Sequence, residues 1–244
     1  MIYFISDIHL GILEREKDAP REDLLLKLLD AVSPDCEVLY IVGDLFDYWF
    51  EYKYVVPKYF YRTLATLKTL RNKNIKIEYL MGNHDFGHKD FFEKEMGITI
   101  YRQDIIREHN GKKFYISHGD GKANNDAGYR FLKKVLRNKF SLWLYLKLHP
   151  DCGIALASSS SKKSRGYTSQ KHYGKTEGME QFAYDRIQEG FNYVIMGHRH
   201  RLIEKQIGKG WYYNLGSWLE KPAFGIYDGS SFRIEFVEEF LNRK

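Results

Sequence analysis

Cysteine is scarce in this sequence: only two occur among 244 residues, Cys36 and Cys152. They lie in different segments and lack the close spacing of metal-binding cysteine pairs, which argues against a thiolate metal site. A stabilising set of disulfides is also excluded by so small a number. We therefore expect both cysteines to be buried or free thiols that take no part in the function.

Long apolar runs are absent as well. No stretch approaches the roughly 20 apolar residues that a membrane-spanning helix needs. The chain begins with the strand-like Ile2–Ile5 and not with the basic start and small-residue cleavage site of a signal peptide. These two absences predict a cytoplasmic protein.

Motifs for binding nucleic acid are missing too, although the net charge of +6 favours an anionic partner. The sequence contains neither zinc-finger spacing nor a basic leucine zipper nor the aromatic motif of RNA-binding domains. A membrane surface or a phosphorylated substrate therefore fits the charge better than nucleic acid does.

The length permits one large α/β domain or two small ones. Apolar runs typical of buried strands alternate with helical patterns, such as the apolar stripe within residues 18–29. No flexible hinge is apparent between them. We therefore expect a single domain over residues 1–244.

Polar side chains follow five of the strand-like runs at the point where each run ends. In α/β proteins, chemistry is placed at the carboxyl ends of the strands. These side chains are Asp7, His9, Asp44, Asn83, His118, His198 and His200. Each one alone could be a cap residue or a structural histidine. Together they offer seven oxygen and nitrogen ligands without a thiolate, and this set predicts two adjacent divalent ions that share one carboxylate.

Two pairs of these residues are separated by a single position. Asp7 and His9 would face the same side of an extended chain, and so would His198 and His200. For Asp7 and His9 this geometry favours two ligands of one metal ion. Asp47, by contrast, is more simply interpreted as a turn or helix-start residue.

The order of the motifs resembles that of the calcineurin-like metallophosphoesterases. The motifs are Asp-x-His, Gly-Asp-x-x-Asp, Gly-Asn-His-Asp, His-Gly and Gly-His-x-His, and they extend from Asp7 to His200. The resemblance implies a four-layer αββα sandwich, in which two sheets lie face to face with helices outside. It also implies one metal bound by Asp7, His9 and His200, another bound by Asn83, His118 and His198, and Asp44 as the bridging ligand.

A closer resemblance is to the UDP-2,3-diacylglucosamine hydrolase family of lipid A synthesis, peripheral membrane pyrophosphatases that are usually manganese-dependent. The similar segments are residues 6–10, 43–49 and 118–120, Asp126, Tyr129, and Ser161-Lys162-Lys163. The resemblance implies cleavage of UDP-2,3-diacylglucosamine to UMP and 2,3-diacylglucosamine 1-phosphate at the inner membrane. Manganese is the implied metal, with iron, zinc or cobalt as alternatives. The implied substrate contacts are Asn83, His84, Asp126, Tyr129, Ser161, Lys162, Lys163 and His198.

His84 departs from that family, many of whose members have Arg after the metal-binding Asn. We expect His84 and Asp85 to be catalytic, because an imidazole kept cationic by Asp85 could stabilise the phosphate oxygens or protonate the leaving group. Histidine at this position occurs in the general superfamily, so a soluble phosphoesterase acting on nucleotides, phosphodiesters or phosphoproteins is the alternative function. A catalytically inactive metal-bound scaffold is disfavoured, because no ligand position is missing.

A basic and apolar segment follows His118, and we expect it to form a helical lid inserted over residues 122–165. It supplies more apolar surface than one core-facing stripe needs. Basic residues lie among the apolar ones, namely Lys133, Lys134, Arg137, Lys139 and Lys147. A basic amphipathic helix with aromatic side chains is typical of binding to an anionic membrane. The alternative is a pair of helices that packs on the sheet and exposes a solvated basic face.

Overall fold

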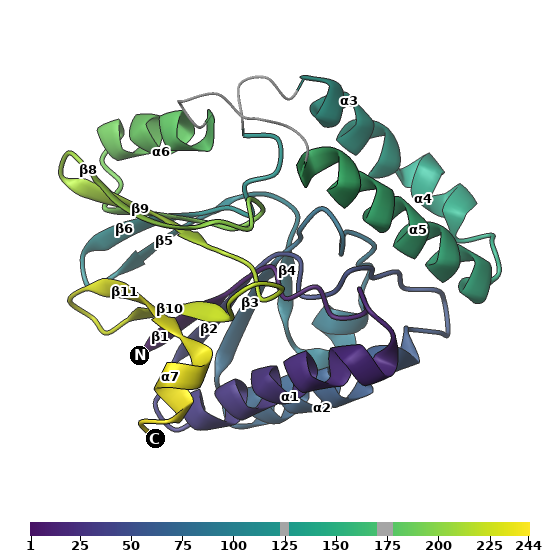
Figure 1. The fold of residues 1–244 in the computed structure, drawn as a ribbon, viewed down its shortest axis with the longest axis horizontal. Helices are drawn as coiled ribbons and strands as arrows, with labels where there is room; N and C mark the ends of the chain where they lie inside the picture. The colour runs from purple at the N-terminus through teal and green to yellow at the C-terminus, as the bar shows by residue number, and fades with distance from the viewer. Residues whose placement is uncertain (123–126, 170–177) are drawn as a thin grey trace.

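Four layers make up the structure, a computed structural model that describes residues 1–122, 127–169 and 178–244. Two β-sheets lie face to face in the middle (Figure 1). Helices α1 (Arg15–Val32) and α2 (Tyr61–Asn72) cover the outer face of one sheet, and helix α6 (Gly178–Gln188) covers the outer face of the other. The αββα sandwich predicted from the sequence is confirmed.

The first sheet contains three of the strands that lead into the predicted site. Its order is β11-β10-β1-β2-β3-β4, in which β1 to β4 are parallel and β10 pairs antiparallel with both β1 and β11. The bounds are β1 Ile2–Ile5, β2 Val38–Val42, β3 Lys76–Leu80, β4 Thr99–Tyr101, β10 Ala223–Tyr227 and β11 Phe232–Phe236. Strands β1 and β2 consist of apolar and aromatic residues because a central parallel strand is buried on both faces.

The second sheet contributes the other two site-bearing strands. Its order is β5-β6-β7-β9-β8, with β6, β7 and β9 parallel and an antiparallel strand at each edge. The bounds are β5 Ile105–His109, β6 Lys112–Ile116, β7 Tyr193–Met196, β8 Leu202–Ile207 and β9 Gly210–Leu215. Strands β5 and β6 form a hairpin whose turn residues, Asn110 and Gly111, both have positive φ, 48° and 71°.

The C-terminal strands are divided between the two sheets. Strand β9 runs parallel to β7, and β10 and β11 return to the first sheet. Strand β8 was not predicted at all. Most of its residues are exposed, and an edge strand facing solvent lacks the apolar pattern by which buried strands are recognised.

Three helices are inserted between β6 and α6, where a lid was predicted. They are α3 (Ala127–Leu136), α4 (Lys139–Tyr145) and α5 (Pro150–Ser169), and they lie together beside one end of the two sheets (Figure 1). The remaining helical elements are short: η1 Lys58–Phe60, the π-helical turn η2 Phe92–Met96, and α7 Val237–Leu241.

Three apolar cores separate the four layers. Phe4 and its neighbour Ile5 lie on opposite faces of β1, so Phe4 packs between the sheets against Phe114 while Ile5 joins the core shared with Leu28 of α1. Ala183 of α6 belongs to the third core, which lies on the outer face of the second sheet. The strands are held from both sides, and this rigidity extends to the polar residues at their ends.

The residue types that are scarce in the sequence lie as expected. Both cysteines are free thiols, Cys36 buried and Cys152 exposed. In the described part of the chain, no helix combines the length and the apolar character that crossing a bilayer requires. The aromatic stretch Tyr48, Trp49 and Phe50 is buried in the core.

Glu51 follows this stretch and anchors a distant loop. Its Oε2 accepts hydrogen bonds from the backbone N–H groups of Lys89, Asp90 and Phe91 at 2.8, 2.8 and 3.0 Å, and its Oε1 accepts one from Trp49 Nε1 at 2.9 Å. Three otherwise unsatisfied donors at the start of η2 are thus satisfied by one buried carboxylate. The loop between β3 and η2, which contains Asn83 and His84, is thereby fixed at its far end.

The pKa of Glu51 reflects these contacts. Burial alone would raise it, but His88, at 3.5 Å, together with the Phe91 N–H and Trp49 lowers the pKa to about 2 from an ordinary value near 4.5. A carboxylate with a depressed pKa stabilises the folded state above its ordinary pKa. That contribution is lost as the pH falls toward the folded-state pKa.

We expect Glu51→Gln to lower the free energy of unfolding by on the order of 2–3 kcal/mol at neutral pH. The deficit should shrink as the pH falls from about 4.5 toward 2, because the wild-type carboxylate is then protonated as well. Urea denaturation at several pH values measures it. Glu93→Gln, on the exposed side of η2, is the matched control and should change little. A deficit independent of pH would contradict this assignment.

Candidate active site

All seven predicted ligand side chains come together at one end of the two sheets. Asp7 and His9 follow β1, Asp44 follows β2, Asn83 follows β3, His118 follows β6, and His198 and His200 follow β7. Both sheets contribute, so the cluster lies where their carboxyl ends meet. Two groups and one shared carboxylate can be distinguished within it.

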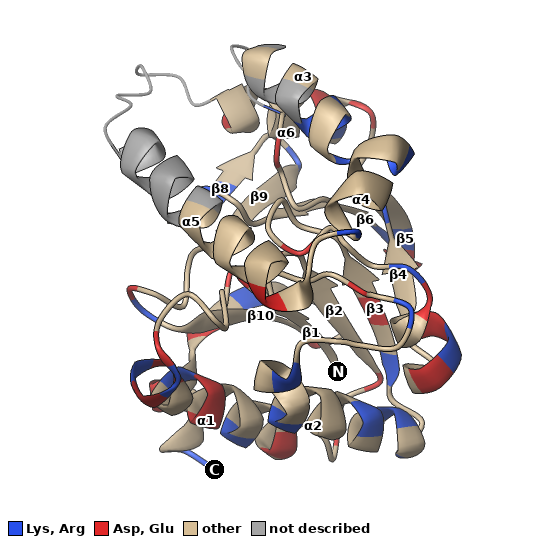
Figure 2. Cartoon of the chain, turned by 90° about the vertical axis from the view of Figure 1, so that its right-hand side faces the viewer, with Lys and Arg blue, Asp and Glu red and all other residues tan. Residues whose placement is uncertain are grey.

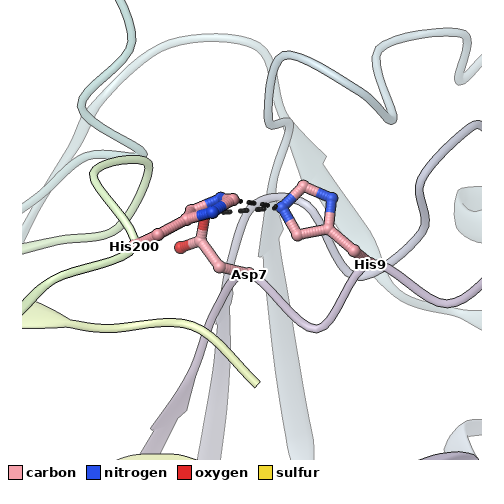
Figure 3. Close-up of side chains that lie close together, drawn as sticks. All are labelled: Asp7, His9 and His200. Atoms are coloured by element: carbon pink, nitrogen blue, oxygen red, sulfur yellow. Dashed lines mark hydrogen bonds and ion pairs between the residues drawn. The ribbon is translucent and has the colours of Figure 1, made fainter. Parts of the chain in front are cut away.

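Asp7, His9 and His200 form the first group (Figure 3). His9 Nε2 lies 3.0 Å from His200 Nε2, and the two nitrogens lie 3.8 and 3.3 Å from Asp7 Oδ1. The Asp7 carboxylate is held by the chain itself, because its Oδ2 accepts hydrogen bonds from Ser6 Oγ at 2.5 Å and from the His198 N–H at 3.0 Å.

Asn83, His118 and His198 form the second group. Asn83 Oδ1 lies 3.0 Å from His118 Nε2 and 2.7 Å from His198 Nδ1. His118 Nδ1 lies 2.9 Å from the Val42 carbonyl oxygen, a contact that requires the proton on Nδ1. Such a hydrogen bond orients the ring and directs Nε2 toward the cluster, as is usual for metal-binding histidines.

Asp44 lies between the two groups. Its Oδ2 is 3.3 Å from His118 Nε2 and 3.7 Å from His9 Nε2, the position that a bridging ligand would need. Its Oδ1 accepts a hydrogen bond from the His84 N–H at 2.8 Å. Burial raises the pKa of Asp44, but His118 and His84 outweigh burial and hold this pKa well below its usual range. In return, and against the effect of its own burial, Asp44 raises the pKa of His118 to about 10.

The donor set fits divalent metal ions. Asp7 and Asp44 are no more than 1% exposed, and buried carboxylates at such close range need a compensating cation. His9 and His200 direct their Nε2 atoms at each other across 3.0 Å, so a proton or a metal ion must lie between the two lone pairs. Mixed carboxylate oxygen and imidazole nitrogen donors suit first-row divalent ions.

The backbone at five of these residues is left-handed. The φ angle is 52° at Asp7, 53° at His9, 52° at Asp44, 69° at His198 and 55° at His200. Residues other than glycine rarely adopt this conformation, and where they do, the site is often functional. The apolar cores on both sides of each strand hold these residues in a backbone conformation that the isolated turns would not adopt.

The expectation that His198 and His200 face one side is therefore wrong, whereas Asp7 and His9 do lie in one group, although neither has an extended backbone. His198 contacts Asn83 in the second group, whereas His200 contacts His9 and Asp7 in the first. The Gly-His-x-His motif is thus divided between the two groups.

Glycine is required where the ligand loops touch. A Cβ atom on Gly43, whose φ is 86°, would lie 2.4 Å from His118 Nδ1. A Cβ on Gly197 would lie 2.2 Å from Asp7 Oδ2. Each glycine stands directly before a ligand residue on one strand and makes space for a ligand from another.

Asp85 does not orient His84 as predicted. Its Oδ1 accepts a hydrogen bond from the Gly82 N–H at 2.8 Å, and its Oδ2 accepts from the Leu45 N–H at 2.9 Å and from the Tyr79 hydroxyl. Asp85 is fully buried and its carboxylate is directed into the protein. It braces the β2 and β3 loops against each other from inside.

The carboxylate beside His84 is that of Asp47, which the sequence suggested was a simple turn residue. Asp47 Oδ1 lies 3.5 Å from His84 Nδ1 and 3.3 Å from His9 Nδ1, and it accepts a hydrogen bond from Ser161 Oγ at 2.9 Å. A ligand candidate, the catalytic candidate and a residue of α5 therefore meet at one buried oxygen. The second Asp of Gly-Asp-x-x-Asp was the signal for this role.

His84 lies next to the first group. Its ring meets that of His9 edge-on, with centroids 4.9 Å apart, and its Nδ1 is 3.1 Å from Ser161 Oγ. Ligand atoms of His9, Asp44 and His84 lie within 4.8 Å of one another. The imidazole is thus close enough to act on a phosphate bound at the cluster.

Helices α3 to α5 attach directly to the loops that contain these residues. Arg137, just after α3, donates hydrogen bonds to the Gly82 carbonyl at 2.7 Å and to Asp120 at 3.1 Å, and Lys133 binds Asp120 at 2.6 Å. Ser161 of α5 is buried against the site. Two of the cations expected on a membrane-facing surface, Lys133 and Arg137, are therefore used to fasten α3 to the core.

The outward surface of α3 and α4 is apolar and basic. Phe131, Phe140 and Trp143 are 70, 67 and 54% exposed. Neither helix contains Asp or Glu (Figure 2). Lys147 places its ammonium 5.1 Å from the Trp143 ring centroid, while Phe140 stacks on the same indole. A cluster of exposed aromatic side chains on one surface is typical of an interaction site, whereas single exposed apolar residues are common on any protein.

The predicted substrate contacts fall into two sets. Asn83, His84, Ser161 and His198 are described and lie at the cluster. Asp126 lies outside the described residues, and Tyr129, Lys162 and Lys163 lie on α3 and α5 with side chains outside the described part.

Oxygen and nitrogen donors gathered at the strand ends of an αββα sandwich are characteristic of metal-dependent hydrolases. The chain belongs to the calcineurin-like phosphoesterase family, whose model matches residues 1–202. The family resemblance of the sequence motifs is thereby confirmed, and the chain is a hydrolase that depends on divalent metal ions.

Curated relatives cover nearly the whole chain. A Porphyromonas gingivalis protein named UDP-2,3-diacylglucosamine hydrolase is 30% identical over 256 residues, covering 98% of each chain. Relatives of the same name from Aeromonas salmonicida and Haemophilus influenzae are 29% and 27% identical, covering 95% and 97% of this chain and 91% and 98% of their own.

We expect Asp47→Asn to weaken metal binding by about 10- to 100-fold, because groups that orient a ligand contribute on this scale. Turnover at saturating metal should also fall, since His84 loses its carboxylate neighbour. Isothermal titration calorimetry with the metal ion measures the change in metal affinity, and mass spectrometry measures the metal content. Asp30→Asn, on an exposed position of α1, is the control. Unchanged metal affinity in Asp47→Asn would refute the role of Asp47.

Proposed function

We propose that the chain cleaves the pyrophosphate bond of UDP-2,3-diacylglucosamine, releasing UMP and 2,3-diacylglucosamine 1-phosphate for lipid A synthesis. The observation that carries the proposal is the contact of Ser161 with both His84 and Asp47, because it places α5 directly on the donor cluster. A lipid-linked nucleotide needs a phosphate-binding centre and an apolar surface side by side. The shared name of the curated relatives supports the same substrate.

We assign two divalent ions to the cluster, most simply manganese. Asp7, His9 and His200 would hold one ion, Asn83, His118 and His198 the other, with Asp44 between them. Bound there, the ions would neutralise the phosphate and lower the pKa of an attacking water.

The protein's own contribution is positioning. Asp44 and Asp7 are fixed by backbone N–H groups and cannot turn away. His84, held by Ser161 and near Asp47, can donate a hydrogen bond to a phosphate oxygen whose charge increases as the water oxygen bonds to phosphorus and the anhydride bond breaks. Asn83 and His198 complete the walls on the other side.

The helices over the site suit a lipid substrate. We infer that α3 to α5 form a lid that receives acyl chains and contacts an anionic membrane, the chain being peripheral to the inner membrane on its cytoplasmic side. Exposed Trp143 and Phe140 would enter the headgroup region, and exposed lysines would meet lipid phosphates at about 1 kcal/mol each.

The decisive assay compares two substrates. Full-length protein loaded with manganese is incubated with UDP-2,3-diacylglucosamine or with a water-soluble phosphodiester, and UMP is quantified by chromatography. We expect rapid release of UMP, and none from Asp44→Ala that retains its fold by circular dichroism. Turnover of the diester alone would overturn the proposal in favour of a soluble phosphoesterase.

His84→Ala should reduce turnover by on the order of 10² to 10³ while leaving the metal content near that of the wild type, because loss of a transition-state hydrogen bond has this effect. His84→Arg should recover part of the rate, since a guanidinium can donate to the same oxygens. A proportionate loss of metal in His84→Ala would instead show that His84 is a ligand, as its proximity to His9 and Asp44 allows.

Trp143→Glu should abolish binding to anionic vesicles and reduce hydrolysis of the lipid substrate more than that of the soluble diester. The change places a negative charge on an exposed part of α4 that we assign to the membrane. Vesicle co-sedimentation at moderate salt measures binding. Tyr184→Glu is the control, because Tyr184 lies on α6 and is 47% exposed against 54% for Trp143. If Trp143→Glu loses the same activity on both substrates and still binds vesicles, α4 is a packed helix without a role at the membrane.

A further inference from the structure

A cavity of about 530 Å³ adjoins the second donor group and has no role in the function described so far. His118 lies in its wall. The lining residues come from the ends of β3 and β6, the connection from β4 to β5, and α3 with its C-terminal end. They are Leu80, Met81, Arg102, Gln103, Asp104, Tyr115, His118, Asp120, Lys122, Lys133 and Arg137.

The charge of this cavity is positive. Four cations line it against two carboxylates, and the carboxylates are already paired, Asp104 with Lys122 and Asp120 with Lys133 and Arg137. An excess of two positive charges therefore remains in the lining of the cavity. Such a lining attracts an anion.

Arg102 is the cation most available to a ligand. Its guanidinium donates to the His88 carbonyl at 2.8 Å and lies 3.8 Å from Met81 Sδ, and it contacts no carboxylate in the described part of the chain. The backbone contact orients the side chain without neutralising it. Gln103, the next residue in the lining, has a side-chain amide that can both donate and accept hydrogen bonds.

The surroundings of α4 and α5 have the opposite character. Phe50 packs against Tyr145, with tilted rings whose centroids are 4.2 Å apart, and meets Phe86 edge-on at 5.6 Å. Ile154 and Ala157 of α5 pack on the same core. The helices inserted over the cluster thus have an apolar side at α4 and α5 and a cationic cavity at α3. A substrate that carries a lipid at one end and a nucleotide at the other matches this polarity.

We propose that the cavity binds the nucleoside 5′-phosphate half of the substrate, with Arg102 as the principal contact to the anion and Gln103 facing the base. The inference rests on the proposed function, because that function supplies the nucleotide. A volume of about 530 Å³ falls in the range of sites that enclose a small ligand. The phosphate would lie toward His118, next to the second donor group.

Binding of the product and its fragments tests the assignment directly. Manganese-loaded wild type is titrated by calorimetry with UMP, ribose 5-phosphate and inorganic phosphate. We expect UMP to bind at least about tenfold more tightly than inorganic phosphate, since the cavity adds contacts to those at the metals. Arg102→Met should weaken both UMP and ribose 5-phosphate by about tenfold or more, and inorganic phosphate by less, because free phosphate can also bind at the metal ions away from Arg102.

Matched variants guard against a general effect of charge or folding. Arg243→Met removes a cation at the exposed C-terminal end and should leave the UMP affinity unchanged. Arg102→Lys keeps the charge and should retain part of the affinity, and Gln103→Ala should bring UMP closer to ribose 5-phosphate. Thermal unfolding of each variant confirms that the protein is folded.

The outcomes separate this inference from the proposed function. The cavity is not the nucleotide site if the wild type binds UMP no better than inorganic phosphate. The same conclusion follows if Arg102→Met and Arg243→Met lose the same amount of affinity for UMP. If UMP binds as expected but UDP-2,3-diacylglucosamine is not cleaved, the cavity still accepts a nucleotide and only the proposed lipid substrate is wrong.

Discussion

Asp7 and Asp44 are buried so close together that their ligand atoms and that of His118 lie within 4.8 Å of one another. Like charges at this range repel strongly in a protein interior, so everything around them must offset that repulsion. Backbone N–H groups of His198 and His84 donate to the two carboxylates, and imidazoles surround them. Left-handed strand ends and unsubstituted glycines allow these groups to approach. The rest of the architecture supports this cluster.

The sequence predicted the parts of the site that depend on local pattern. Apolar runs located the strands, and polar residues after them located the ligands, because strand ends converge in an α/β sandwich. Roles that depend on long-range packing could not be predicted. Glu51 caps a loop some 40 residues away, and Asp47 meets Ser161 across 114 residues. The solvent-facing β8 and the left-handed turns at His198 and His200 have no signature in residue type.

The three inserted helices have two distinct faces. Toward the core, Arg137 and Lys133 hold the β6 loop through Asp120, and Arg137 also binds the β3 loop at Gly82. Toward solvent, aromatic side chains and lysines remain available. Basic residues that look equivalent in the sequence therefore have two roles: some attach the helices to the core, and others are exposed to solvent. Only the three-dimensional position of each one separates the two uses.

A single oxygen of Asp47 contacts both a metal-ligand candidate, His9, and helix α5, through Ser161. Binding of an ion by His9 would therefore be coupled to the position of α5 through Asp47. If a bound ion stabilises the docked position of α5, then docking of α5 increases the affinity for the ion by the same free energy. Removal of the metal would then weaken the docking of α5, and displacement of α5 would weaken the binding of the metal.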